Sequence, residues 1–177
     1  MANPKVIIQG AYYKNRTLPS LNDYLNAIGK NPKAGGRFKV EYMKVCVWSI
    51  RKNLRGYKVE HPPIILHYRF YESKKGKKRD VSNIFSLCAK FFEDALQVCG
   101  VIPNDNPEWI ENFTTEFAWI DGEPYIEIEI EERGEEHEAP VYDLGDVETR
   151  KRAAETTDKL SYLRRVRQDA RFERFYK

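Results

Sequence analysis

The sequence is poor in cysteine, the residue that builds disulfides and many metal sites. It contains only three cysteines in 177 residues, at positions 46, 88 and 99. Their separations show no metal-ligand spacing. Cys88 and Cys99 fall on one predicted helix, where they cannot form a disulfide with each other. This pattern argues against a disulfide framework and predicts a reduced, cytoplasmic protein.

The sequence also lacks a long apolar run and a strong net charge. Its first ten residues, MANPKVIIQG, contain too short an apolar run for a signal peptide or a membrane span. The net charge of +3 is too small by itself to indicate a nucleic-acid partner, but the charges are distributed unevenly along the chain. With 41% hydrophobic and 32% charged residues, the composition predicts one globular domain with an appendage and no membrane partner.

Apolar periodicity predicts an α+β fold, in which a small mixed β-sheet is flanked by helices and followed by a C-terminal helical extension. Ser20 and Asp23 resemble a capping box that opens the first helix. Residues 30–37 (KNPKAGGR) are predicted to form a cationic loop, and residues 121–124 a hairpin turn. The predicted order is strand, helix, helix, strand, helix, strand, strand, helix, at residues 5–9, 21–28, 39–54, 64–71, 81–99, 109–120, 125–131 and 146–176.

The stretch from Lys74 to Asp105 contains most of the candidate chemistry. Asp80 lies just before the predicted central helix, and Gly100 just past it is a stop signal. At about 100° per residue the helix divides into two faces. One is an apolar stripe of Ile84, Leu87, Cys88, Phe91, Ala95 and Val98, and the other carries Asn83, Lys90 and Asp94 with Ser86 close by.

This spacing allows Lys90 to face two acids, Asp80 and Asp105, that are held in the flanking loops. Two carboxylates and one ammonium group suit a divalent-metal phosphodiesterase, because the carboxylates hold the metal and the cation neutralises charge on the phosphate. An alternative explains the same residues without catalysis. Asp80 then caps the helix, and Lys90 is a solvated surface residue.

A run of positive charge leads into this helix. In a nuclease these side chains would bind the phosphates of the DNA backbone, whereas the ordinary alternative is a solvated loop. The residues are Lys74, Lys75, Lys77, Lys78 and Arg79.

Two other groups of polar residues are interpreted as structural. His67 could act as a general base, but a strand histidine between aromatic residues is more often packed and hydrogen-bonded. Glu127, Glu129 and Glu131 alternate with isoleucines, as on an exposed sheet face that does not contact DNA.

The run RDVSNI…AKFFEDALQVCGVIPNDN resembles the signature of the RusA-type Holliday junction resolvases, a family of small nucleases common in phages and prophages. The resemblance covers residues 5–131 and includes the segment 18–24 (LPSLNDY), which is similar to a Pro-Ser-x-Asn-x-Tyr loop of that family. Counted back from Asp94, Lys90 takes the place of the family lysine; counted forward from Asp80, that place falls on Ser86. The other matches are Asp80, Asn83, Asp94-Ala95-Leu96 and Asp105.

The resemblance implies a RusA-like nuclease domain at residues 1–133 that acts as a homodimer and cleaves branched DNA with Mg²⁺ or Mn²⁺. It implies that Asp80 and Asp105 are metal ligands, that Asn83 and Asn104 are additional ligands, and that Lys90 stabilises the transition state. The predicted catalytic set is therefore Asp80, Lys90 and Asp105.

One position departs from the family pattern. Ser82 stands where the family has its second aspartate, so one expected carboxylate ligand is a neutral hydroxyl. Because charge count is a main determinant of Mg²⁺ and Ca²⁺ affinity, the alternative function is a branched-DNA-binding protein with weakened or lost cleavage.

Residues 134–177 lie outside the resemblance. They are predicted to form an acidic linker and a basic C-terminal helix. Three interpretations of this segment stay open. It could be a helix docked on the body or on a second subunit, an arm that contacts the DNA backbone, or a partly disordered tail.

Overall fold

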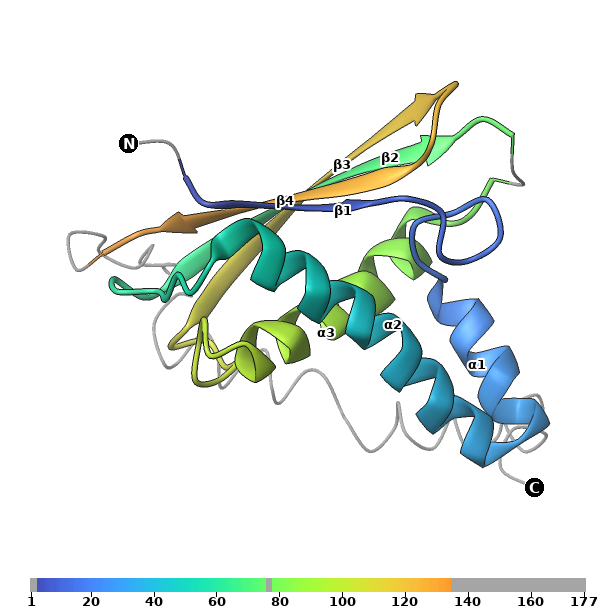
Figure 1. The fold of residues 1–177 in the computed structure, drawn as a ribbon, viewed down its shortest axis with the longest axis horizontal. Coiled ribbons are helices and arrows are strands. Elements are labelled where there is room, and N and C mark those ends of the chain that lie inside the picture. The colour runs from blue at the N-terminus through green and yellow to red at the C-terminus, as the bar shows by residue number, and fades with distance from the viewer. Residues whose placement is uncertain (1–2, 76–77, 135–177) are drawn as a thin grey trace, which may run out of the picture. The chain divides into compact units, whose positions relative to one another are not determined.

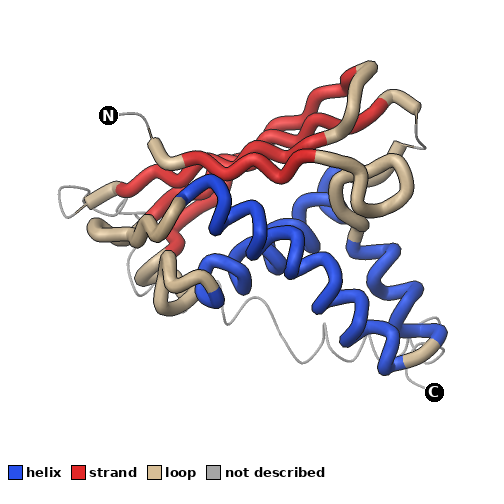
Figure 2. Tube along the Cα trace, in the orientation of Figure 1, coloured by secondary structure: helices blue, strands red, loops and turns tan. Residues whose placement is uncertain are grey.

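The computed structural model describes residues 3–75 and 78–134 (Figures 1 and 2). Within these residues the predicted α+β class is confirmed, with a mixed four-stranded sheet and three helices. The elements are β1 (Lys5–Gln9), α1 (Leu21–Lys30), α2 (Pro32–Leu54), β2 (Ile64–Ser73), α3 (Val81–Val98), β3 (Ile110–Ile120) and β4 (Tyr125–Glu132).

The strand order in the sheet is β1-β4-β2-β3. β2 and β3 are parallel, and β4 is antiparallel to both β1 and β2. The predicted hairpin at residues 121–124 is therefore wrong, because β2 lies between the two strands that this turn connects. The physical reason is the α3 crossover: it returns β3 parallel to one edge of β2, so β4 pairs with the other edge.

The core lies between the sheet and the helices, which cover one face of the sheet (Figure 1). Along β2 and β4, alternate residues such as Tyr68 and Ile128 are fully buried, in keeping with the period of two. The predicted apolar stripe of α3 is confirmed except at its end. Val98 is the last helical residue and its side chain is 55% exposed, because the stripe continues past the packed part of the helix.

The prediction of a loop at residues 30–37 is also wrong, because α2 begins at Pro32. The Asn31 side chain accepts a hydrogen bond from the Lys33 backbone N–H at 2.9 Å, and Pro32 takes the first helical position, where no N–H is needed. A Cβ at Gly35 would lie 2.6 Å from Cγ1 of Ile28. This glycine therefore allows α1 and α2 to pack closely.

The chain divides into two units, Met1–His137 and Glu138–Lys177. The predicted acidic linker and the helix at 146–176 lie outside the described residues. In the part of the chain that the structure describes, none of the helices combines the length and the apolarity needed to cross a membrane.

Candidate functional site

Lys90 is the centre of a cluster of charged side chains on α3. Its Nζ lies 2.8 Å from Oδ2 of Asp105 and 2.9 Å from Oδ1 of Asp94, one helical turn further along. The other carboxylate oxygen of Asp94 lies 2.7 Å from Nζ of Lys39 on α2. The Lys90 side chain remains 55% exposed, so the cluster is open to solvent.

The turn after α3 brings Asp105 to this cluster. Gly100 adopts a positive φ of 70°, a conformation that glycine tolerates and that ends the helix. Val101 and Ile102 then bury their side chains in the core and anchor the turn. The backbone N–H of Asp105 donates to Oδ1 of Asn104 at 2.8 Å, which orders the aspartate locally. The side-chain oxygen of Asn104, which was predicted as a metal ligand, therefore accepts a hydrogen bond from the backbone of the turn.

The charges of the cluster shift one another's pKa values. Partial burial would raise the pKa of Asp94, but hydrogen bonds from Lys39 and Lys90 outweigh it and lower that pKa. Hydrogen bonds to Asp105 and Asp94 raise the pKa of Lys90 well above its usual range. Lys90 therefore stays charged at neutral pH.

Glu93 belongs to the same cluster and was not identified from the sequence. Burial raises the pKa of its carboxyl to about 7, and the charges of Asp105 and Asp94 add to this rise while Lys90 opposes it. A carboxyl group that titrates near neutral pH beside an exposed lysine is typical of functional sites. The sequence contained one signal, since Glu93 and Asp94 are adjacent acids on the helix.

Asp80 lies apart from this cluster. Its Oδ2 accepts a hydrogen bond from Nδ2 of Asn83 at 3.1 Å, at the N-terminus of α3. Asp80 and Lys90 are ten positions apart, which corresponds to about 15 Å of helix rise. Among the described residues, Asp80 has no hydrogen bond or ion pair with Lys90 or Asp105, whose contacts are with each other and with Asp94. The structure thus brings Lys90 and Asp105 together but does not bring Asp80 to them.

The ligand chemistry around Lys90 partly suits a hard cation. Oxygens of Asp94 and Asp105 both lie within hydrogen-bond distance of the same ammonium, so they are within about 6 Å of each other. Carboxylate oxygens are preferred Mg²⁺ ligands. Among the described residues, however, no cluster of three or more carboxylate, imidazole or thiol side chains is arranged to hold a metal ion.

The residues of the basic segment have different environments. Lys74 forms an ion pair with Asp121 at 2.8 Å, and Nζ of Lys78 lies 5.8 Å from the ring centre of Trp119. Lys75 is exposed, and Lys77 lies outside the described residues. Lys74, Lys75 and Lys78 are thus all exposed to solvent.

Arg79 is largely buried, which corrects its predicted exposure to DNA. Its guanidinium lies 2.8 Å from a carboxylate oxygen of Glu72, whose other oxygen lies 2.7 Å from Arg16. Arg79 also donates to the carbonyl of Leu18 at 2.9 Å. Burial lowers the pKa of Arg79, and the negative charge of Glu72 opposes this effect. Arg79 therefore holds three segments of the chain together.

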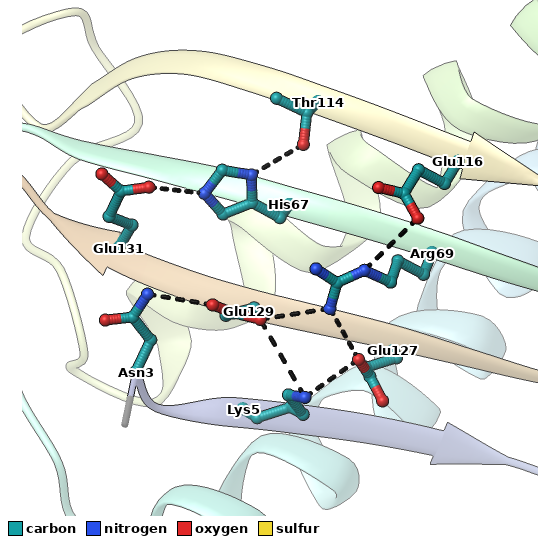
Figure 3. A network of polar contacts seen from close by, with 9 residues as sticks. All are labelled: Asn3, Lys5, His67, Arg69, Thr114, Glu116, Glu127, Glu129 and Glu131. Carbon is teal, nitrogen blue, oxygen red and sulfur yellow. Dashed lines mark hydrogen bonds and ion pairs between the residues drawn. The ribbon is translucent and has the colours of Figure 1, made fainter. Parts of the chain in front are cut away.

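The interpretation of the strand residues as structural agrees with the structure. Figure 3 shows them on the sheet face opposite the helices, where Arg69 of β2 donates to Glu127 and Glu129 of β4 at 2.8 and 3.1 Å. His67 contacts Thr114 at 2.7 Å and Glu131 at 2.8 Å through its two ring nitrogens. These side chains neutralise one another across neighbouring strands.

No protein-family model matches the chain, and no curated protein matches it. The resemblance to the RusA-type resolvases therefore rests on the residues quoted above. It stays a prediction.

Proposed function

We propose that this protein is a Mg²⁺-dependent endodeoxyribonuclease of the RusA type that cleaves branched DNA such as Holliday junctions. The observation that carries the proposal is the contact of Lys90 with Asp105, because these residues match the lysine and the last aspartate of the family signature. Fifteen positions separate them in the sequence, and the fold places their charged groups 2.8 Å apart. Mn²⁺ is expected to replace Mg²⁺.

The chemistry of the residues assigns each a role. A bound Mg²⁺ supplies a Lewis acid and an activated water for phosphodiester hydrolysis. Asp105, beside Lys90, and Asp80, just before α3, would each supply a carboxylate ligand to this ion. Lys90 stays protonated because its pKa is raised, so it acts by stabilising negative charge on the phosphate rather than by donating a proton.

We further propose that the protein acts as a homodimer, as the RusA resemblance implies. Two copies related by a twofold axis, with their α3 helices antiparallel, would bring Asp80 of one chain near Asp105 of the partner subunit. Such a dimer has two equivalent composite sites, which suits cleavage of two strands at a four-way junction.

The decisive measurement is cleavage of a synthetic four-way junction in Mg²⁺ or Mn²⁺. We expect Asp105→Asn and Lys90→Ala each to lower the cleavage rate by about 10²-fold or more, because each removes a charge that acts on the reacting phosphate. Glu60→Gln is the control, since this acid is exposed and makes no ion pair with the basic segment or the Lys90 cluster among the described residues. Full activity of Lys90→Ala would refute the assigned role.

Mixing two inactive variants tests the dimer. A heterodimer of Asp80→Asn with Asp105→Asn contains one composite site in which both aspartates are intact, so part of the activity should return. If each site instead uses both aspartates of one chain, no activity returns.

A second candidate function is a branched-DNA-binding protein that cleaves poorly or not at all. Ser82 favours it, because this exposed residue places a hydroxyl where the family has a carboxylate. Tight junction binding without cleavage, not restored by Ser82→Asp, would support the binding protein. A rise in cleavage by Ser82→Asp would identify a weakened nuclease.

A further inference from the structure

The solvent-exposed side of α2 carries a row of positive charge. The helix Pro32–Leu54 contains six Lys or Arg residues and one acid, Glu41. Lys39 faces α3, where it pairs with Asp94. The other cations fall with two apolar residues within about 120° of the helix circumference. We call this surface the outer face of α2, and it consists of Lys33, Arg37, Val40, Glu41, Lys44, Trp48, Arg51 and Lys52.

The five cations of the outer face outnumber its single acid, Glu41, which also lines the groove beside Val40. Within residues 3–75 and 78–134, none of these five cations lies within ion-pair distance of a carboxylate. With five cations and one acid the outer face keeps a net positive charge, and its like charges repel one another. A polyanion bound along the helix would relieve that repulsion.

Apolar groups lie exposed between these charges. Trp48 is 55% exposed and Val40 is 52% exposed. The ring of Trp48 contacts solvent on the helix surface, with Nζ of Lys52 4.9 Å from its centroid. A shallow groove of about 560 Å³ runs beside Val40 and is also lined by Gly36, whose missing side chain would meet nothing within 4 Å. A partner backbone can therefore approach α2 closely at this point.

The dimensions of the outer face suit a DNA duplex. From Lys33 to Lys52 the helix rises by about 29 Å, close to the 34–36 Å of one turn of B-DNA. Cations spread along this length can contact successive phosphates, while Val40 and Trp48 contact sugar carbons. Two separated apolar side chains give little area for insertion into a membrane or for a stable protein interface.

We propose that the outer face of α2 binds the phosphate backbone of a duplex DNA arm, without reading its sequence. The inference rests on the proposed function only in taking DNA as the ligand. It assigns the binding of the arm to a surface distinct from the Lys90 cluster on α3. The predicted basic segment at residues 74–79 then contributes less to DNA binding than the outer face does, since Lys74 and Arg79 are paired with acids.

The test compares two variants that each remove one positive charge. Lys44→Gln lies on the outer face, and Lys5→Gln lies on the sheet face shown in Figure 3. The affinity of the full chain for a fluorescent four-way junction is measured between 50 and 200 mM salt, without divalent metal. Each phosphate contact contributes about 0.9 to the slope of log K against log salt. For each subunit bound to the junction, Lys44→Gln should reduce the magnitude of this slope by about 0.9 and Lys44→Gln with Lys52→Gln by about 1.8, while Lys5→Gln leaves it unchanged.

The outcomes separate this inference from the proposed nuclease activity. Equal slopes for Lys44→Gln, Lys5→Gln and the unmodified chain would overturn the inference, whereas junction cleavage would still establish the nuclease. A reduced slope in a chain that never cleaves would support the inference and refute the nuclease.

Two further readouts address other occupants of the same surface. If Lys44→Gln lost binding to anionic phospholipid vesicles and kept the salt slope of DNA binding unchanged, the outer face would bind a membrane and the proposal would be overturned. If a variant changed the oligomeric mass and left the DNA slope unchanged, the outer face would instead bind a second copy of the chain, and the proposal would be overturned. Thermal unfolding of each variant shows whether the fold is intact.

Discussion

At the scale of single residues, Glu93 shows how burial changes the chemistry of one carboxyl group. Its pKa is raised from 4.5 to about 7, mainly by burial. The folded protein therefore holds this proton more strongly than the unfolded chain, and the resulting stabilisation is lost as the pH rises from about 4.5 through 7. We expect the free energy of unfolding to fall by on the order of 1–2 kcal/mol over this window, after allowing for partial solvent screening.

Urea denaturation at pH 5 and pH 8 measures this effect. Glu93→Gln should remove that part of the pH dependence and be the more stable protein at pH 8. Glu41→Gln, at an exposed position of α2, is the control and should keep the dependence of the unmodified chain. An unchanged pH dependence in Glu93→Gln would contradict the assignment.

At the scale of elements, two adjacent glycines of α2 have opposite consequences. A Cβ at Gly35 would lie 2.6 Å from Cγ1 of Ile28, whereas one at Gly36 would meet nothing within 4 Å. Gly35→Ala should lower the free energy of unfolding by about 1–2 kcal/mol, because the clash between α1 and α2 exceeds the gain in helix propensity. Gly36→Ala should raise it by about 0.5–1 kcal/mol. Urea denaturation of both variants tests the pair, and equal effects would contradict the close packing of α1 on α2.

At the scale of the whole molecule, Glu72 joins parts of the chain that are distant in sequence. Its side chain is 4% exposed and contacts Arg16 at 2.7 Å and Arg79 at 2.8 Å. Glu72→Gln removes the carboxylate between two largely buried guanidinium groups and should lower the free energy of unfolding by about 3–5 kcal/mol. Glu116→Gln is the control, since its side chain is 70% exposed beside Arg69, and it should cost less than about 1 kcal/mol. Chemical denaturation that finds the two variants equally stable would exclude a stabilising role for Glu72.

Local patterns in the sequence were sufficient to predict most helices and strands and about half of the candidate site. The α3 periodicity placed Lys90 and Asp94 on one exposed face, and Asp105 was predicted in the loop that follows the helix. These features depend on residues within a few positions of one another. The loop predicted at residues 30–37 was wrong for a reason that lies in the tertiary structure. Two adjacent glycines lower helix propensity, so the sequence favours a loop. In the folded protein, however, Gly35 packs against Ile28, where a larger residue would not fit.

The sequence by itself determined the α+β class, the alternating strands, the apolar face of α3 and the exposed position of Lys90, because each follows from periodicity or turn chemistry within one segment. Only the tertiary structure decided the strand order, the burial of Arg79, the raised pKa of Glu93 and which acids contact Lys90. These properties depend on atoms that are distant along the chain, and burial and Coulomb interactions act through space rather than along the sequence.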